Sequence, residues 1–110
     1  MQLPYLQNAL VEEPKVTQYL LSEERSEGKA AFFAAFGFRL AQWELLRDAL
    51  LAHASSYEVV RVLKNPYGAK YIVEGSLLSP DSRNPNVRSV WIIDVGTFTP
   101  RLVTAYALER

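Results

Sequence analysis

Hydrophobic residues change their spacing halfway along the chain, from every third or fourth position to every second. The helical spacing predicts three helices, at residues 14–22, 29–38 and 40–54. Pro14 suits the first turn of the first helix, and Gly37 suits the end of the second. The third helix has the clearest pattern, because its apolar residues share one side: Leu40, Trp43, Leu46, Leu50 and Ala54.

Alternation of apolar and polar residues takes over after residue 56. It predicts four strands, at residues 57–64, 69–77, 87–95 and 101–108. The tetrapeptide NPYG at 65–68 has the proline and the glycine of a tight turn between the first two strands. The most polar stretch, SPDSRNPN at 79–86, carries two prolines and is predicted to be a loop.

Helices followed by strands with short connections are typical of an α+β fold. We expect two or three N-terminal helices packed on one face of a four-stranded antiparallel meander sheet. The prediction is a single domain over residues 1–110, with a helical part at 14–54 and a sheet part at 57–108. The other face of the sheet is then partly open, and we look for function there.

Composition supports a folded domain and narrows its setting. The chain has 110 residues, 49% of them hydrophobic, and no cysteine, so it can bury a core but form no disulfide. No signal pattern opens the chain, and no apolar run approaches the roughly 18 residues of a membrane span. These features predict a cytoplasmic protein that does not interact with a membrane.

Charge and motifs limit the chemistry. Twelve basic residues balance twelve acidic ones, although residues 56–110 are slightly basic, with seven against five. A single histidine and no cysteine leave no Cys/His zinc site, and the glycines form no phosphate-binding loop. The acidic residues lack the spacing of a calcium loop. We therefore expect no cofactor and no metal, which leaves acid–base chemistry or plain binding.

Three charged residues are expected on one face of two neighbouring strands. Lys70 and Glu74 lie four residues apart on the second strand, and Arg88 lies on the third. A carboxylate beside cations can act as a general base next to groups that stabilise a phosphorane-like charge. The same three residues also fit an ordinary cross-strand ion pair on a solvated face, which the spacing alone favours.

His53 and Lys29 occupy opposite ends of predicted helices. His53 has the pKa range of a general acid, or its partial positive charge stabilises a helix C-terminus. Lys29 begins a helix, where a cation opposes the helix dipole. A bound phosphate would explain Lys29, as would a carboxylate partner such as Glu12 or Glu13.

The last strand holds three more candidates. Alternation places Thr104 and Tyr106 on one face with Leu102, and Arg101 on the other face with Val103. Only a bulge would bring Arg101 and Thr104 into one site. Thr104 can hydrogen-bond a phosphate or a strand neighbour, and Tyr106 suits a half-buried ring with its hydroxyl at the rim.

Two aromatic residues of the sheet allow two interpretations. The apolar alternation around Trp91 and Tyr71 favours core positions. The sharper alternative is a platform on which unstacked bases lie.

Five segments are distinctive: GKAAFFAAFGF, WELLRDALLAHA, PYGAKYIVEG, VRSVWIID and PRLVTAY. Together they resemble an uncharacterised bacterial domain family, over about Val16 to Tyr106. Its members occur as short stand-alone proteins and as C-terminal modules of polymorphic toxins. The resemblance implies a layout similar to the barnase–EndoU–RelE-like ribonucleases, for which metal-free RNA cleavage is the activity usually proposed.

The same resemblance implies a set of site residues. The polar pattern of the family falls on Lys29, Lys70, Glu74, Arg88, Arg101, Thr104 and Tyr106. The connector LSEERSEGK departs from the family, because Arg25 or a neighbour stands where members carry a histidine before the lysine matched by Lys29. If that histidine is the general acid, this chain lacks it, and His53 matches a different position.

Two hypotheses follow. In the first, RNA lies across the open face, where Lys70, Arg88 and Lys29 hold phosphate. Arg101 and Tyr106 also contact the substrate. Glu74 or His53 moves protons, and Thr104 positions the scissile group. In the second, the domain is a non-catalytic module that binds a protein partner, of immunity type or another kind, or oligomerises. Near-zero net charge and the missing histidine favour the second.

Overall fold

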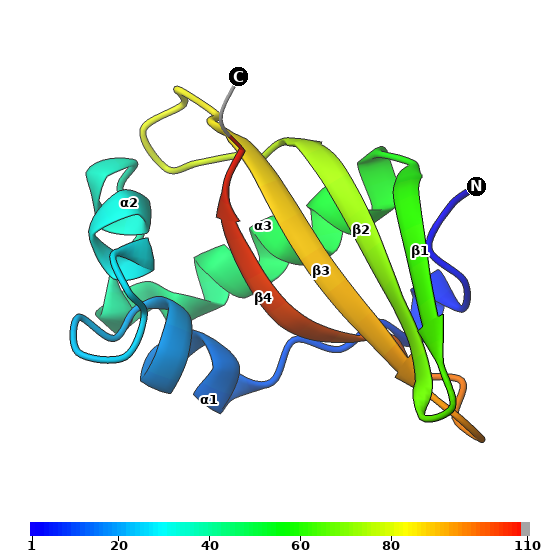
Figure 1. Cartoon of the computed structure of the whole chain (residues 1–110). Helices are drawn as coiled ribbons and strands as arrows, with labels where there is room; N and C mark the ends of the chain where they lie inside the picture. Colours follow the sequence, from blue (N-terminus) through cyan, green and yellow to red (C-terminus); the bar gives the residue numbers. More distant parts are fainter. Residues whose placement is uncertain (109–110) are drawn as a thin grey trace.

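Helical segments precede a four-stranded sheet in the computed structural model, which describes residues 1–108 (Figure 1). Three α-helices lie in this part of the chain: α1 (Glu13–Lys15), which continues as the π-helical turn η2 (Val16–Leu20), α2 (Lys29–Ala35) and α3 (Trp43–Ser56). The 3-10 turns η1 (Leu6–Asn8) and η3 (Leu40–Gln42) precede α1 and α3. The strands are β1 (Val59–Asn65), β2 (Gly68–Ser76), β3 (Asn86–Asp94) and β4 (Arg101–Ala107).

The four strands form an antiparallel meander in the order β1-β2-β3-β4. The predicted α+β fold, with helices before the strands, is therefore confirmed. Short connections explain this order, because antiparallel neighbours need only tight turns. In the first turn, the side-chain carbonyl of Asn65 accepts hydrogen bonds from the N–H groups of Tyr67 and Gly68, at 2.8 and 3.1 Å.

Helix α3 lies behind the sheet in Figure 1, whereas α1 and α2 lie beside β4. The core fills the space between α3 and the sheet. Trp91 is fully buried there between strand neighbours and the apolar side of α3. Other fully buried members of this core are Val73 and Val87 from the sheet and Leu46, Leu50 and Ala54 from α3. The opposite side of the sheet, which we call the open face, has no α-helix across it in residues 1–108.

The first ten residues connect the two edges of the sheet. Val59 N–H donates to the carbonyl of Met1 at 2.7 Å, beside the start of β1. At the other edge, Leu10 forms a parallel bridge with Arg101. The Leu10 N–H donates to the Pro100 carbonyl at 2.8 Å, and the Leu10 carbonyl accepts from the Leu102 N–H at 3.0 Å. The segment therefore holds the start of β4 in place.

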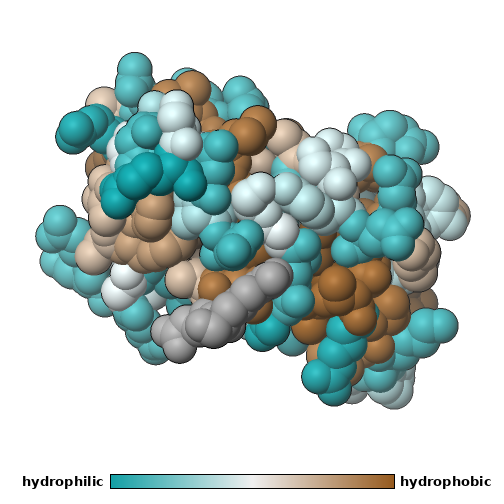
Figure 2. Space-filling model, turned by 90° about the horizontal axis from the view of Figure 1, so that it is seen from above, coloured by the Kyte–Doolittle hydropathy of each residue, from teal (hydrophilic) through white to brown (hydrophobic). Residues whose placement is uncertain are grey.

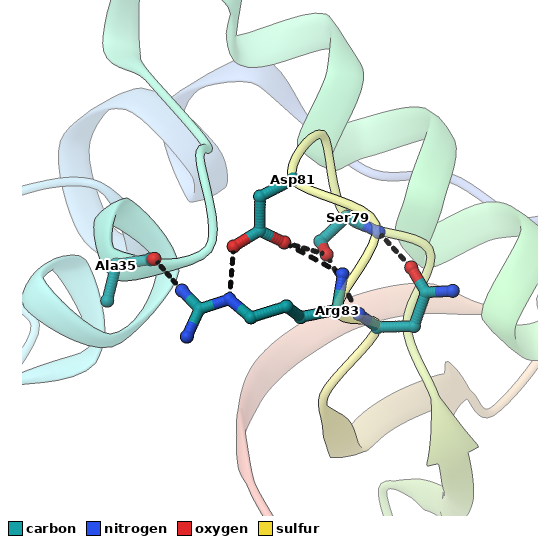
Figure 3. A network of polar contacts seen from close by, with 5 residues as sticks. Ala35, Ser79, Asp81 and Arg83 are labelled. Carbon is teal, nitrogen blue, oxygen red and sulfur yellow. Dashed lines mark hydrogen bonds and ion pairs between the residues drawn. The ribbon is translucent and has the colours of Figure 1, made fainter.

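The loop between β2 and β3 is attached to the C-terminal end of α2 (Figure 3). Arg83 pairs with Asp81 at 2.6 Å and donates a hydrogen bond to the carbonyl of Ala35. The Arg83 guanidinium also lies 4.4 Å from the centre of the Phe36 ring. The N–H of Arg83, together with the Ser79 hydroxyl and the guanidinium, lowers the pKa of the Asp81 carboxyl. Within residues 1–108, no helix has the length and apolar character needed to cross a bilayer.

Candidate functional site on the open sheet face

Strand register arranges the open face in three rows that cross β2, β3 and β4. The first row, nearest the β2–β3 loop, consists of Glu74, Arg88 and Tyr106. The second consists of Ile72, Val90 and Thr104, and the third of Lys70, Ile92 and Arg101. Six of the eight residues proposed from the sequence therefore share this face.

A β-bulge in β4 corrects the faces expected from simple alternation. Val90 pairs with Thr104, but Trp91 pairs with Leu102, so Val103 has no partner on β3. Leu102 consequently packs in the core, only 3% exposed, whereas Thr104 points to the open face. The expectation that Thr104 shares a face with Leu102, opposite Arg101, was wrong. Arg101 and Thr104 lie on the same face because the extra residue restores their parity.

Arg88 connects the members of the first row. Its Nε and Nη2 atoms lie 2.7 and 2.5 Å from the same carboxylate oxygen, Oε2 of Glu74. Its Nη1 donates to the Tyr106 hydroxyl at 3.3 Å. These hydrogen bonds, with Tyr106 as the largest cause and Glu74 next, raise the pKa of Arg88. The Arg88–Glu74 pair expected from the sequence is therefore present, and Tyr106 extends it.

Thr104 lies next to a helix residue that sequence reasoning did not select. The hydroxyls of Thr104 and Tyr19, from η2, are 3.0 Å apart and share a hydrogen bond. Tyr19 fell within the apolar side of the predicted helix at 14–22, and no local pattern distinguished it from a core residue. The contact exists because the helical segment made of α1 and η2 lies beside β4.

Lys29 stands at the rim of the open face, next to β4. Its ammonium group lies 5.6 Å from the centre of the Tyr19 ring and 6.0 Å from that of Tyr106, and it donates to the Ser26 carbonyl at 3.3 Å. The alternative of a Glu12 or Glu13 partner is not supported, because no ion pair within residues 1–108 involves Lys29. The ammonium group of Lys29 therefore lies beside two tyrosine rings, without a carboxylate partner in this part of the chain.

Lys70 and Arg101 occupy the third row, away from Glu74 and Arg88. Arg101 pairs with Asp94 at 3.1 Å, which balances its charge. Lys70 is exposed, and none of the ion pairs in residues 1–108 includes it. Arg61 adds another exposed cation on β1, opposite Ile72. The open face therefore carries more positive than negative charge.

His53 lies on the opposite side of the sheet and is 2% exposed. Its Nε2 is 3.1 and 3.0 Å from the carbonyls of Gly75 and Val87, to which it donates. Ser89 Oγ accepts the indole N–H of Trp91 at 2.9 Å, so its own hydrogen goes to His53 Nδ1, also at 2.9 Å. Burial lowers the pKa of His53, in agreement with this neutral form.

The position of His53 separates it from the other candidates. His53 lies in the last turn of α3, but all three of its hydrogen-bond partners belong to the sheet. Trp91 shares this buried side, and Tyr71 packs half-buried against the same core, so the core interpretation of both is confirmed. The base-stacking platform was wrong for Trp91, because α3 covers its side of the sheet.

Two surface depressions border Tyr106. One, of about 480 Å³, is lined by Glu27, Gly28, Lys29, Phe32, Tyr106 and Ala107. The other, of about 370 Å³, is lined by Arg88, Tyr106, Ala107 and Leu108. Tyr106 therefore lies between a cavity with Lys29 and a cavity with Arg88. Within residues 1–108, no three His, Cys, Asp or Glu side chains gather as a metal site requires.

Comparison with known proteins places this arrangement in a family. Residues 2–109 match the family described as Domain of unknown function (DUF6883). The chain belongs to the DUF6883 family. This confirms the resemblance to an uncharacterised domain family, and the match extends over almost the whole chain. No curated protein matches the sequence.

A solved structure shares the DUF6883 fold seen here. It is a chain of the "Contact-dependent growth inhibition toxin - immunity protein complex from Klebsiella pneumoniae 342". The two chains have a TM-score of 0.73 and 14% sequence identity, over 96% of this chain and 98% of the other. At this identity the likeness shows a common fold.

Proposed function

We propose that this domain is a toxin-type module that binds RNA on its open face and cleaves the RNA backbone without a metal. The observation that carries the proposal is the continuous group Glu74–Arg88–Tyr106, with Lys29 beside it. A phosphodiester placed over Tyr106 would meet a cation from β3 and another from the start of α2. Backbone binding of this kind needs positive charge and hydroxyl donors, and both are present.

The cleavage step uses the ribose 2′-hydroxyl as the nucleophile. Arg88 contacts Oε2 of Glu74, and Oε1 has no hydrogen-bond partner within residues 1–108, so Oε1 is the base that takes the 2′-hydroxyl proton. The 2′-oxygen then bonds to phosphorus as the bond to the 5′-oxygen breaks. The products are a 2′,3′-cyclic phosphate and a 5′-hydroxyl end.

Tyr106 supplies the proton for the leaving 5′-oxygen. Its oxygen accepts a hydrogen bond from Arg88 Nη1, so its own hydrogen is free to be donated. Glu74 and Tyr106 stand on strands either side of β3, with strands spaced about 4.8 Å apart, so base and acid flank the phosphate. Arg88 and Lys29 stabilise the charge that develops on the phosphoryl oxygens, and Thr104 orients the scissile group.

A protein partner is part of the proposal. The structural neighbour is a chain from a toxin–immunity protein complex, which supports an immunity-type protein as the partner of this domain. Such a partner would cover the cations of the open face and block RNA. An RNA target in the cytoplasm agrees with the cytoplasmic location predicted from the sequence.

A second candidate function, a non-catalytic protein-binding module, is favoured by one observation. The single histidine lies in the core behind the sheet and cannot reach the open face. Figure 2, viewed from the top of Figure 1, shows hydrophobic surface at its lower right, on the side of the open face. On the edge strand β1, Val60 and Leu63 are 56% and 40% exposed, which suits a partner strand or a second copy.

The experiment is incubation of the purified protein with total RNA in the presence and absence of EDTA, together with its induced expression in a susceptible bacterium. We expect EDTA-resistant cleavage that leaves cyclic phosphate ends, and growth arrest. Glu74→Gln and Arg88→Ala should remove cleavage. Intact RNA and full tolerance, with a correctly folded protein, would overturn the cleavage proposal and leave the binding module as the remaining candidate.

Matched controls separate loss of function from loss of charge. Glu44→Gln and Arg47→Ala make the same chemical changes on α3, on the other side of the molecule. Both control variants should cleave like the unchanged protein. If they lose activity as Glu74→Gln and Arg88→Ala do, the open face has no special role and the proposal fails.

A further inference from the structure

The larger depression beside Tyr106 has features that the cleavage step does not use. Phe32, Glu27 and Gly28 line it, and none of the three takes part in the proposed cleavage. Its volume of about 480 Å³ lies in the range of small-molecule sites. Lys29 lines it as well, so the depression begins where the phosphate-binding group ends.

The Phe32 ring is held rigidly beside this depression. It lies 5.1 Å from the ring of Phe33 and 5.2 Å from that of Phe36, with tilted and edge geometries that fix its plane. Phe33 is fully buried, whereas Phe32 remains half-buried and reaches the depression. A rigid, partly exposed aromatic ring is the surface on which an unpaired base stacks.

The lining of the depression offers hydrogen-bond groups of both kinds. The Glu27 carboxylate is exposed and forms no ion pair or hydrogen bond within residues 1–108, so it is a free acceptor. The backbone N–H of Gly28 has no partner in the same part of the chain, so it is a free donor. Glu27 has a left-handed backbone, with φ of 54°, as Gly28 does with φ of 92°.

We propose that this depression is a nucleobase subsite, which selects a base whose edge has an N–H beside a carbonyl. The inference rests on the proposed RNA-binding function. Guanine and uracil have such an edge: Glu27 accepts the ring N–H, and the Gly28 N–H donates to the neighbouring carbonyl. In adenine and cytosine the two roles are exchanged. A base in the same position then places its ring-nitrogen acceptor against the Glu27 carboxylate and its amino donor against the Gly28 N–H. The base stacks on Phe32, with its phosphate between Lys29 and Arg88.

The test measures, by NMR or calorimetry, how tightly the purified protein binds the four nucleoside 3′-monophosphates and ribose phosphate. We expect the guanine and uracil nucleotides to bind about tenfold more tightly than the other two, as one matched pair of hydrogen bonds provides. Glu27→Gln should reduce this preference to less than about threefold without weakening ribose phosphate. Equal affinity for all four, or no gain over ribose phosphate, overturns the subsite.

Two further variants make the result specific. Phe32→Leu should weaken all four nucleotides by about tenfold, because it removes the stacking surface and leaves Glu27 and Gly28 unchanged. Glu44→Gln on α3 loses a carboxylate far from the depression and should keep the full preference. If Phe32→Leu does not fold, Glu27→Gln alone decides, since Glu27 is exposed.

The subsite and the cleavage activity can fail separately. Selective nucleotide binding with intact RNA supports the subsite and refutes the cleavage step. RNA cleavage at every base, with nucleotides that bind no better than ribose phosphate, supports the cleavage step and refutes the subsite.

Discussion

Arg101 and Thr104 point to the same face of the sheet although they lie three residues apart on one strand. In a regular strand such residues point to opposite faces, because side chains alternate. The unpaired residue Val103 restores the common direction. The bulge therefore determines which side chains of β4 reach the open face.

Deletion of Val103 tests this role directly. Without Val103, Leu102 and Thr104 would pair with Trp91 and Val90 in a regular ladder, so every side chain keeps its face. We expect a folded protein that loses about 1 kcal/mol at most, measured by urea denaturation. Deletion of Ile72 from β2, which pairs with β3 without a bulge, is the matched control: it turns one half of that strand to the wrong face and should prevent folding. Similar stabilities for the two deletions would contradict the bulge.

Arg88 and Lys70 should differ in how much each contributes to the rate of RNA cleavage. Arg88→Ala removes a group that contacts both Glu74 and Tyr106, whereas Lys70 lies two rows away with no ion pair among residues 1–108. We expect Arg88→Ala to reduce RNA cleavage at least about a hundredfold and Lys70→Ala less than about tenfold. Initial rates with a fixed RNA substrate measure both. A larger effect of Lys70→Ala would place the reaction in the third row.

Substitution of Arg88 by lysine should also reduce RNA cleavage. A lysine keeps the charge but cannot direct several N–H groups along the fixed directions of a guanidinium. Arg88→Lys should therefore bind RNA with nearly unchanged salt dependence yet cleave slowly. Retention of full activity would show that charge alone is sufficient at this position.

His53 should make the protein less stable in mild acid. Burial lowers its pKa below the ordinary value of 6.5, so the unfolded chain binds a proton that the folded chain does not. The contribution of neutral His53 to the free energy of unfolding is fully present above about pH 6.5. It is lost as the pH falls toward the lower folded-state pKa. Urea midpoints at about pH 7.5 and about pH 5.5 measure the loss. Asp81→Asn is the control. It should lose as much stability between these two pH values as the unchanged protein, because the pKa of Asp81 is lowered from 3.8 and lies outside this window.

Gly75 is required by the ring that packs on it. A Cβ at this position would lie 2.5 Å from atoms of the Tyr57 ring. Gly75→Ala should therefore lower the free energy of unfolding by about 1 to 3 kcal/mol. In a double-mutant cycle, Tyr57→Leu should recover part of the loss, because it removes the ring. Strictly additive effects would show that the contact does not limit the substitution.

The sequence by itself determined much of this protein. Alternation on β2 and β3 correctly predicted that Lys70, Glu74 and Arg88 share a face, because both strands are regular and neighbouring. Helix α3 followed from its apolar spacing, and the meander followed from short turns between the strands. These features depend on interactions between residues near in sequence, which a local pattern records.

Tertiary structure decided the remainder. Alternation defines two faces but not which one α3 covers, so the burial of His53 and Trp91 depended on packing. The bulge at Val103 has no local signature, since its cause is the pairing of β4 with β3. Thr104 and Tyr19 are 85 residues apart in the chain, and only the docking of the helical segment made of α1 and η2 beside β4 brings their hydroxyls together. A site assembled across such separations is a property of the packed fold, because no short segment contains all of its parts.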